Sequence, residues 1–210
     1  MRGAIVGSLG ASLVLVIWIG SQHAQQLLIV LCVVAALLAL DSAASDASDG
    51  RARVHLGGTV LLVAAAMLAA WLARNIKEVP GILIAYGRYA ASRVGQADII
   101  YKGEGWNASV AVSRLSNGVL NYHNAGKVQA SSEPQDMRLQ RMLGHLTTLI
   151  PSSAKSVLVI GCGAGVTAGA VSIDPAVERL TIAEIEPLVP RVVSTYFAEH
   201  NFNVVANPKT

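Results

Sequence analysis

Three glycines spaced two residues apart follow a short run of residues typical of a buried strand. The run is Ser156–Ile160, and Gly161, Gly163 and Gly165 come directly after it. Glycine lets the backbone turn tightly and approach a ligand closely, and a helix that starts behind such a turn points free amide groups at the ligand. The small and apolar residues of Val166–Ser172 suit that helix. The pattern predicts a nucleotide-binding loop between a strand and a helix.

A carboxylate at the end of the next predicted strand completes this constellation. That strand is Leu180–Ala183, and Glu184 follows it, 23 residues after Gly161. An acid at this place accepts hydrogen bonds from the ribose hydroxyls of a nucleotide. The predicted cofactor-binding residues are therefore Gly161, Gly163, Gly165 and Glu184. The alternative interpretation is a structural turn between strand and helix that holds no ligand.

The glycine spacing separates two classes of ligand. A dinucleotide loop has the pattern G-x-G-x-x-G/A, and counted from Gly161 its last position is Val166. A shifted match runs from Gly163 to Ala168, but it starts two residues too late. The pattern G-x-G-x-G better resembles the loop used for S-adenosylmethionine-type ligands, which carry no pyrophosphate. We therefore expect a sulfonium nucleoside rather than a dinucleotide.

The segment in front of the glycine loop is predicted to form a small antiparallel sheet and one helix. Asn117-Gly118 suits a tight hairpin turn between two of the strands. The helix, Asp136–Leu149, has apolar residues at helical spacing. His145 within it is interpreted as a packing residue, because no second metal ligand or nucleophile lies at a distance along the sequence that would indicate a metal site or a catalytic pair. The predicted strands are Asp98–Lys102, Ser109–Leu115, Val119–Tyr122 and Lys127–Ala130.

The first third of the chain is much more apolar than the rest. Only 14% of the 210 residues are charged, against about a quarter in soluble domains, and the mean hydropathy is +0.50. Of the 29 charged residues, six lie in residues 1–73 and 23 in residues 74–210. Segments 4–20, 26–42 and 56–73 are predicted transmembrane helices, since their length is close to that of a bilayer span. Buried helices of a soluble bundle are the alternative, but the segments lack a polar face.

A cleaved signal peptide is a second alternative for the first segment. Residues 21–24 (SQHA) lack small residues at both cleavage positions, and further apolar segments follow, so retained spans are favoured. Positive charges do not decide the orientation, because three lie on each side: Arg2, Arg51 and Arg53 against Arg74, Lys77 and Arg88. A cytosolic nucleoside decides it instead. The prediction is an integral membrane protein whose C-terminal part faces the cytoplasm.

The predicted domain order follows from these segments. Residues 1–78 form the transmembrane region and residues 79–97 a juxtamembrane helix, centred on Ile82–Val94. Residues 98–152 form the β-domain with its helix, and residues 153–210 begin a Rossmann-like α/β domain that is incomplete at its C-terminus. A net charge of +3 is too mild to indicate nucleic-acid binding. Cys32 and Cys162 are interpreted as reduced thiols, with no zinc spacing and no expected metal.

Residues 104–205 resemble the first part of a spermidine synthase, a polyamine aminopropyltransferase, and in particular its membrane-anchored branch. The resemblance rests on SVLVIGCGAG (156–165) and VERLTIAEIE (177–186), which match the family's strand, glycine loop and second strand ending in acid-Ile-acid. Glu104-Gly105 and residues 126–129 (GKVQ) match landmarks of its β-domain. The resemblance implies a small β-domain followed by a methyltransferase-like Rossmann fold. It also implies that Glu184 binds ribose and that Glu186 is the second acid.

The resemblance implies aminopropyl transfer. In that reaction an amine attacks the aminopropyl carbon beside the sulfonium of decarboxylated S-adenosylmethionine, and methylthioadenosine leaves. The catalytic residue is unknown here, because the family's aspartate is expected beyond Thr210. The expected co-substrate is decarboxylated S-adenosylmethionine or S-adenosylmethionine. The expected partners are a lipid bilayer, a nucleoside and an amine, with a homodimer as a further possibility and no nucleic acid.

Several positions depart from the family pattern. The glycine-loop aspartate that grips the aminopropyl amine is Ala164 here, and a nucleoside-contacting glutamine is Ala108. The family's Asp-Gly of the β-domain appears as Ala125-Gly126. In the helix, Leu139-Gln140-Arg141 replaces a Tyr-His/Gln-Glu run, so only Gln140 remains as a predicted substrate-binding residue. Arg141 would repel an amine cation, which argues against putrescine.

The sequence therefore predicts a divergent or truncated aminopropyltransferase-like protein. Two alternatives from other classes stay open. One is an S-adenosylmethionine-dependent methyltransferase, because the loop GCGAG suits that ligand and lacks the aminopropyl aspartate. The other is a non-catalytic membrane protein with a degenerate nucleotide-binding fold.

Overall fold

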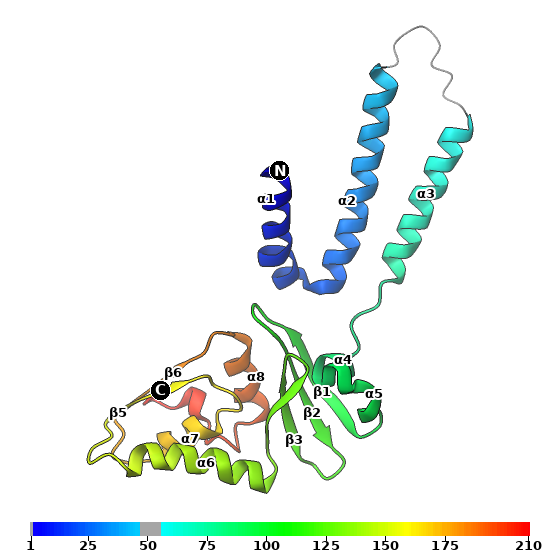
Figure 1. The fold of residues 1–210 in the computed structure, drawn as a ribbon. Helices are drawn as coiled ribbons and strands as arrows, with labels where there is room; N and C mark the ends of the chain where they lie inside the picture. The colour runs from blue at the N-terminus through cyan, green and yellow to red at the C-terminus, as the bar shows by residue number, and fades with distance from the viewer. Residues whose placement is uncertain (1, 47–55) are drawn as a thin grey trace. The chain divides into compact units, whose positions relative to one another are not determined.

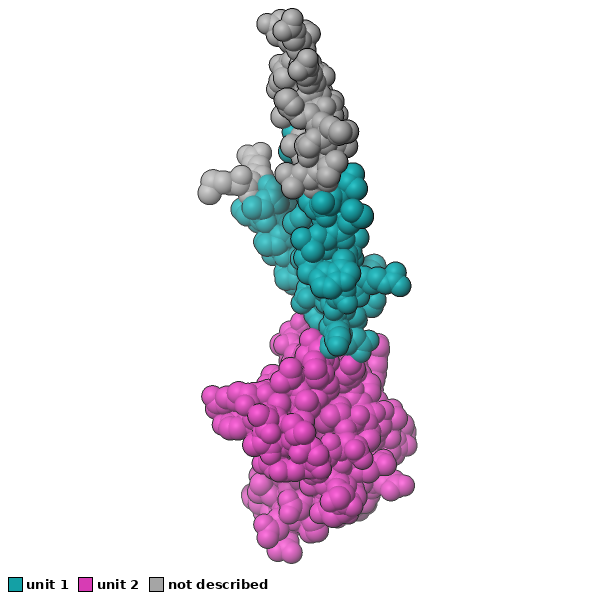
Figure 2. Space-filling view, turned by 90° about the vertical axis from the view of Figure 1, so that its right-hand side faces the viewer, with its two compact units in different colours: residues 1–78 teal, residues 79–210 magenta. Residues whose placement is uncertain are grey.

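The computed structural model of the chain describes residues 2–46 and 56–210. These residues belong to two compact units, 1–78 and 79–210, which are coloured separately in Figure 2. Arg51 and Arg53, which enter the count of positive charges above, lie outside the described residues.

The first unit is helical. Helix α1 (Arg2–Gly10) passes through a π-helical turn, η1 (Ala11–Leu15), into α2 (Val16–Asp46), and α3 spans Leu56–Asn75. Gly20 inside α2 has φ 77° and ψ 165°, which lie outside the helical region, so α2 is kinked at this residue. Figure 1 shows that the chain reverses direction between the helices labelled α1 and α2. Gln22 and Gln26 of α2 donate side-chain hydrogen bonds of 2.8 and 3.2 Å to the carbonyls of Ile76 and Ala73. These amides satisfy backbone acceptors at the end of α3, where a helix has no partners of its own.

One stretch of the described residues, Gly3–Ala39, is apolar and long enough to cross a membrane. It lies near the N-terminus, where a signal sequence also meets the same criteria of length and composition. Leu62–Asn75 is a shorter apolar helix. Large apolar side chains of both are exposed, among them Trp18 and Trp71. Of the three spans expected from the sequence, the first and most of the second lie within this stretch, and the third lies in α3. That these helices cross a membrane stays a prediction.

The second unit begins with short helices rather than the single helix expected over residues 82–94. These are α4 (Gly81–Tyr86), the 3₁₀ turn η2 (Gly87–Tyr89) and α5 (Ala90–Arg93). The division falls at Gly87, which has φ 52° and lies against the turn at Gly126. A Cβ atom on Gly126 would come within 3.0 Å of the Gly87 Cα atom, so the two backbones touch. A continuous helix could not make this contact.

The predicted small antiparallel sheet is confirmed. Its strands are β1 (Ala97–Glu104), β2 (Ser109–Leu115), β3 (Leu120–Asn124) and β4 (Lys127–Ser131), paired in that order. Alternate residues of a strand point to opposite faces. Ala111 packs toward α4 together with Tyr86, whereas Val110 and Val112 face the α/β part of the chain. The sheet thus lies between the short helices and the glycine loop (Figure 1).

The α/β part begins after helix α6 (Pro134–Leu149). Strands β5 (Ser156–Ile160) and β6 (Arg179–Ala183) pair in parallel and are joined through α7 (Val166–Ser172). Helix α8 (Leu188–Tyr196) and the 3₁₀ turn η3 (Val204–Ala206) follow. The Leu180 amide donates a 2.7 Å hydrogen bond to the Lys209 carbonyl, so the chain beyond η3 returns to β6. This is the strand, helix and strand order expected from the sequence.

Helix α6 forms where its apolar spacing predicts it, but most of that apolar face is exposed. Its buried residues are Met137, Gly144 and Thr148. Gly144 packs against the backbone of Thr167 and the side chain of Ala170 in α7. The small residues let the two helices approach closely, and this contact decides which face of α6 is buried. The exposed apolar residues of α6 are Leu139, Met142, Leu143, Leu146 and Leu149.

Candidate functional site

The glycine loop lies between the end of β5 and the start of α7, and it turns through three left-handed residues. Gly161, Gly163 and Gly165 have φ values of 84°, 52° and 77°. The Gly161 amide donates a 2.8 Å hydrogen bond to the carbonyl of Ala183, and the Gly165 amide donates a 2.8 Å bond to that of Cys162. The first bond ties the loop to the end of β6, and the second closes the turn before the helix.

The glycines play two different structural roles. A Cβ atom on Gly161 or Gly163 would meet no atom within 4 Å, so the chain leaves open space beside these two residues. A Cβ atom on Gly165 would lie 2.8 Å from Nδ2 of Asn201, so Gly165 is needed for packing. Asn201 also donates from Nδ2 to the Ala164 carbonyl at 3.1 Å. Gly161 and Gly163 therefore form the open side of the loop, and Gly165 its packed side.

Glu184 lies against this open side. Its Oε2 accepts a 2.7 Å hydrogen bond from the Cys162 amide, and its Oε1 accepts a 2.9 Å bond from the Glu186 amide. Glu184 is half-buried. Each carboxylate oxygen can accept more than one hydrogen bond, so both keep acceptor capacity for hydroxyl donors. Within the described residues the amides of Gly163 and Ala164 donate to no acceptor, and they are the free donors of the loop.

Glu186 is a structural acid. It is 2% exposed, and its Oε2 accepts hydrogen bonds of 2.6 and 3.4 Å from the amides of Asn107 and Ala108. Its Oε1 accepts a 3.0 Å bond from the Leu188 amide. Gly105 lies so close to the carboxylate that any Cβ there would overlap it. Glu186 therefore joins the loop between β1 and β2 to the start of α8, and it is not open to a ligand.

Gln140 forms hydrogen bonds with two other residues of the chain. Its side-chain Nε2 donates a 3.3 Å hydrogen bond to the Ser131 carbonyl, and its backbone carbonyl accepts a 3.1 Å hydrogen bond from Oγ1 of Thr167. Thr167 lies two residues after Gly165, so Gln140 is connected to the start of α7. The structure thus brings Gly161, Gly163 and Glu184 together directly, whereas Gln140 reaches the loop only through Thr167.

Two buried side chains, one in the glycine loop and one on β3, are held in their neutral forms. Burial, with the nearby Glu184 carboxylate adding to it, raises the pKa of the Cys162 thiol to about 12. Burial also raises the pKa of Tyr122 to about 12, although a hydrogen bond from Asn124 opposes the shift. Neither group is ionised near neutral pH, so neither supplies a nucleophile or a base.

Three residues of this region carry no signal that would identify them from the sequence alone. Asn201 and Thr167 act through contacts with distant segments, and Gly105 acts through the buried Glu186.

No group of three or more histidine, cysteine, aspartate or glutamate residues that could hold a metal ion occurs in the part of the chain that the structure describes.

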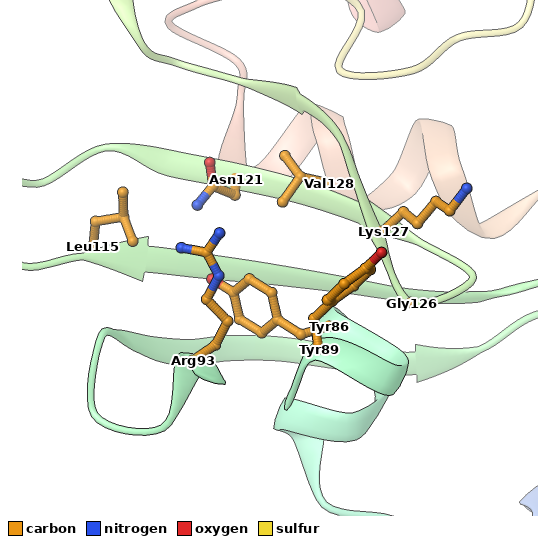
Figure 3. Close-up of a pocket in the computed structure, with 8 residues that line it drawn as sticks. All are labelled: Tyr86, Tyr89, Arg93, Leu115, Asn121, Gly126, Lys127 and Val128. Atoms are coloured by element: carbon orange, nitrogen blue, oxygen red, sulfur yellow. The ribbon is translucent and has the colours of Figure 1, made fainter. Parts of the chain in front are cut away.

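A second hollow, of about 410 Å³, lies between the short helices and the small sheet. Arg93 reaches toward Asn121 beside the ring of Tyr86, whereas Lys127 points away (Figure 3). Arg93 already donates a 3.1 Å hydrogen bond to Oε1 of Gln96, and its guanidinium lies 5.9 Å from the Tyr86 ring centre. This hollow shares no residue with the glycine loop.

The chain is similar to known proteins over part of its length. It is 32% identical over 84 residues to the polyamine aminopropyltransferase of Sodalis glossinidius (strain morsitans), a match that covers 40% of this chain and 29% of that protein. The chain therefore spans less than a third of the curated relative that it matches. No protein-family profile matches the chain.

Two solved structures are similar to the chain at 21% identity. One is a spermidine synthase in complex with the transition-state analogue AdoDATO, and the match covers 53% of this chain and 37% of that one, with a TM-score of 0.49. The other is spermidine synthase from Thermotoga maritima, with 53% and 39% covered and the same TM-score. The sequence match thus gives homology to a polyamine aminopropyltransferase at low identity, over part of the chain.

Proposed function

We propose that the chain binds a sulfonium nucleoside on Gly161, Gly163 and Glu184 as part of an aminopropyltransferase-like protein. The observation that carries the proposal is the pairing of the Glu184 carboxylate with the Cys162 amide, beside two glycines that face open space. The carboxylate would accept hydrogen bonds from the ribose hydroxyls, and the free amide of Gly163 would donate to the ligand. The low-identity relationship to a polyamine aminopropyltransferase supports this class of ligand.

The proposed reaction is a nucleophilic substitution. The nitrogen lone pair of an amine forms a bond to the aminopropyl carbon of decarboxylated S-adenosylmethionine, the carbon–sulfur bond breaks, and its electron pair stays on the sulfur of methylthioadenosine. The amine loses one proton to a base. The contribution of the described residues is to position the nucleoside, and such positioning supplies much of the rate in reactions of this kind.

A methyltransferase is the second candidate, and one observation favours it. Ala164 stands in the middle of the loop, is 2% exposed, and belongs to the apolar core. No carboxylate is therefore available at this position to hold the amine of an aminopropyl group. S-adenosylmethionine would make the same contacts with Glu184 through its ribose. The two candidate functions therefore differ in how the protein binds the part of the ligand beyond the sulfonium, which is an aminopropyl group in one ligand and an amino-acid group in the other.

The first unit is proposed to anchor this protein in a membrane, with the second unit in the cytoplasm. The apolar stretch Gly3–Ala39 supports the anchor. Its exposed leucine, valine and tryptophan side chains suit lipid better than water. Cytoplasmic orientation rests on the ligand, because S-adenosylmethionine-type nucleosides are cytosolic.

The test is titration calorimetry of the full chain in a nonionic detergent. Decarboxylated S-adenosylmethionine, S-adenosylmethionine and methylthioadenosine are titrated separately. Binding of the nucleosides should weaken ten-fold or more in Glu184→Gln, because a neutral amide loses the charge-assisted hydrogen bonds to the ribose. The matched control is Glu178→Gln. Glu178 is exposed and pairs with Lys155 at 2.9 Å, away from the loop.

The outcomes separate the three hypotheses. Preference for the decarboxylated ligand supports aminopropyl transfer, and preference for S-adenosylmethionine supports the methyltransferase. If neither ligand nor methylthioadenosine binds the native chain, the nucleoside site is wrong and the non-catalytic alternative stands. Equal binding by Glu184→Gln and Glu178→Gln would also reject the assignment of Glu184.

A further inference from the structure

A cavity of about 630 Å³ lies between α6 and the segment that follows α8. Its polar lining consists of Arg138, Arg141 and His145 from α6, His200 from beyond α8, and Ser132 in front of α6. None of these residues belongs to the glycine loop or to the hollow in Figure 3. The cavity is therefore a separate feature of the second unit.

Three basic side chains of the cavity come from one face of α6. Arg138, Arg141 and His145 are spaced by three and four residues, which places their side chains along one side of a helix. No aspartate or glutamate lines the cavity. Asp136, on the same helix, is turned toward β4, where its Oδ2 accepts hydrogen bonds from the amide and hydroxyl of Ser131. The basic side chains therefore line the cavity with no carboxylate among the described lining residues.

Arg141 packs against an aromatic ring. Its guanidinium lies 5.3 Å from the ring centre of Phe202, in a cation–π arrangement. Phe202 has φ 56°, and the next residue, Asn203, has φ 52°. Two successive non-glycine residues with left-handed backbones are unusual and cost free energy. With this backbone conformation, the segment after α8 places Phe202 against Arg141 and His200 in the lining of the same cavity.

Two nitrogen atoms beside the cavity are shielded from water and lack partners. They are Nε of Arg141 and Nδ1 of His200, neither of which has a hydrogen-bond partner among the described residues. The His200 ring instead packs edge-on against Phe197, at 5.9 Å between ring centres. A polar nitrogen that is shielded from water without a hydrogen-bond partner is unfavourable. An anion in the cavity would pair with the Arg141 guanidinium.

We propose that this cavity binds a phosphate-bearing small molecule through Arg138, Arg141, His145 and His200. Guanidinium groups present paired N–H donors that match two oxygens of a phosphate, and they stay charged at all relevant pH values. The cavity volume lies in the range of small-molecule sites and exceeds the size of a bare phosphate ion. Met137 and Met142 add apolar lining for the non-phosphate part of the ligand.

The site is tested with inorganic pyrophosphate alone, titrated into the full chain in a nonionic detergent at low salt. Pyrophosphate is a small probe of phosphate recognition with no nucleoside part. It should bind with a dissociation constant in the micromolar to low millimolar range and weaken ten-fold or more in Arg141→Gln. Arg138→Gln is a second variant, because Arg138 is exposed and its replacement leaves the packing of α6 intact.

The controls separate this site from other sources of anion binding. Arg114→Gln removes an exposed arginine on β2, outside the cavity, and should leave pyrophosphate binding unchanged. Glu184→Gln should also leave it unchanged, even though it weakens nucleoside binding. Absence of binding at millimolar pyrophosphate overturns the proposal. Equal affinity of the native chain, Arg141→Gln and Arg138→Gln overturns it as well, as does a loss of binding in Glu184→Gln.

Discussion

Ala164 occupies a position where an acid would change both the fold and the chemistry of the loop. Its carbonyl accepts a hydrogen bond from Asn201, and its side chain is packed in the core that the small sheet shares with α8. Val110, Tyr122 and Val193 belong to the same cluster. An aspartate here would place a carboxylate among apolar groups, with no cation of the cluster to pair with it. The apolar packing around position 164 therefore suits an uncharged alanine and not a carboxylate.

Restoring an aspartate at this position should therefore not restore an aminopropyl site. We expect Ala164→Asp to lower the free energy of unfolding by about 2 to 4 kcal/mol, since a buried unpaired carboxylate loses its hydration. Urea unfolding followed by far-ultraviolet circular dichroism measures this change. Ala176→Asp, at an exposed position, is the control and should change stability by less than about 0.5 kcal/mol. A stable Ala164→Asp that binds decarboxylated S-adenosylmethionine more tightly would contradict this account.

At the scale of elements, α4 is attached to the small sheet by a buried polar group of three side chains. His123 of β3 is fully buried, and its Nε2 lies 2.8 Å from Oγ of Ser113 in β2. The Tyr86 hydroxyl of α4 lies 3.3 Å from the same Oγ, and the rings of Tyr86 and His123 meet edge-on at 4.7 Å. Burial lowers the pKa of His123 to about 4, partly opposed by the backbone of Ala85.

This histidine makes the second unit sensitive to acid. Because the folded-state pKa lies below the ordinary value of 6.5, the stabilisation is complete above pH 6.5 and is lost as the pH falls toward 4. The loss should reach about 3 kcal/mol near pH 4, from 1.36 kcal/mol per pKa unit. Urea unfolding at a series of pH values measures it. His123→Gln should flatten the slope between pH 6.5 and 4. A native chain with no slope in this range would show that His123 titrates normally.

The elements differ in how well the sequence predicts them, for physical reasons. The hairpin at Asn117-Gly118 and the strands around it are set by local alternation and turn chemistry, and they form as predicted. The end of α4 is set by the contact between Gly87 and Gly126, about forty residues apart, which no local pattern reveals. The buried face of α6 likewise depends on Gly144 meeting α7. Local chemistry predicts the elements, and contacts distant in the chain decide their breaks and faces.

The candidate site shows the same division. The spacing of Gly161, Gly163 and Glu184 is readable in the sequence, and the structure places the Glu184 carboxylate on the loop. The different role of Gly165 depends on Asn201, which lies 36 residues further on. Glu186 is readable as an acid, but its burial by Asn107 and Ala108 follows from how the small sheet meets α8. Spacing identifies the candidate residues, and packing decides which of them stay open on the surface of the loop.

At the scale of the whole molecule, residues 79–210 form one compact unit in which the small sheet and the α/β part share a core. The first unit differs from it, because large apolar side chains are exposed along the stretch Gly3–Ala39, both before and after Gly20. In water, exposed surface of this kind is unfavourable in proportion to its apolar area. A bilayer would place the same side chains in favourable surroundings, and for this reason we propose a membrane anchor for the first unit.

Membrane insertion of the first unit predicts resistance to alkaline extraction. The full chain, expressed in bacteria, should stay in the membrane fraction after a carbonate wash. Leu31 lies in α2 and is 51% exposed. Leu31→Arg should reduce the retained fraction, since an arginine near the centre of a span costs about 2.5 to 3.5 kcal/mol on the insertion scale. Leu31→Ala is the control and should be retained like the native chain.

The orientation follows from a reporter fused behind Thr210. A fluorescent protein that matures in the cytoplasm should be bright, and alkaline phosphatase at the same place should be inactive, because a cytosolic nucleoside requires the second unit on that side. Release of the native chain by carbonate would mean that the apolar helices are covered by protein instead of lipid. An active phosphatase would place the glycine loop away from its ligand, and it would count against the nucleoside proposal as well as the predicted topology.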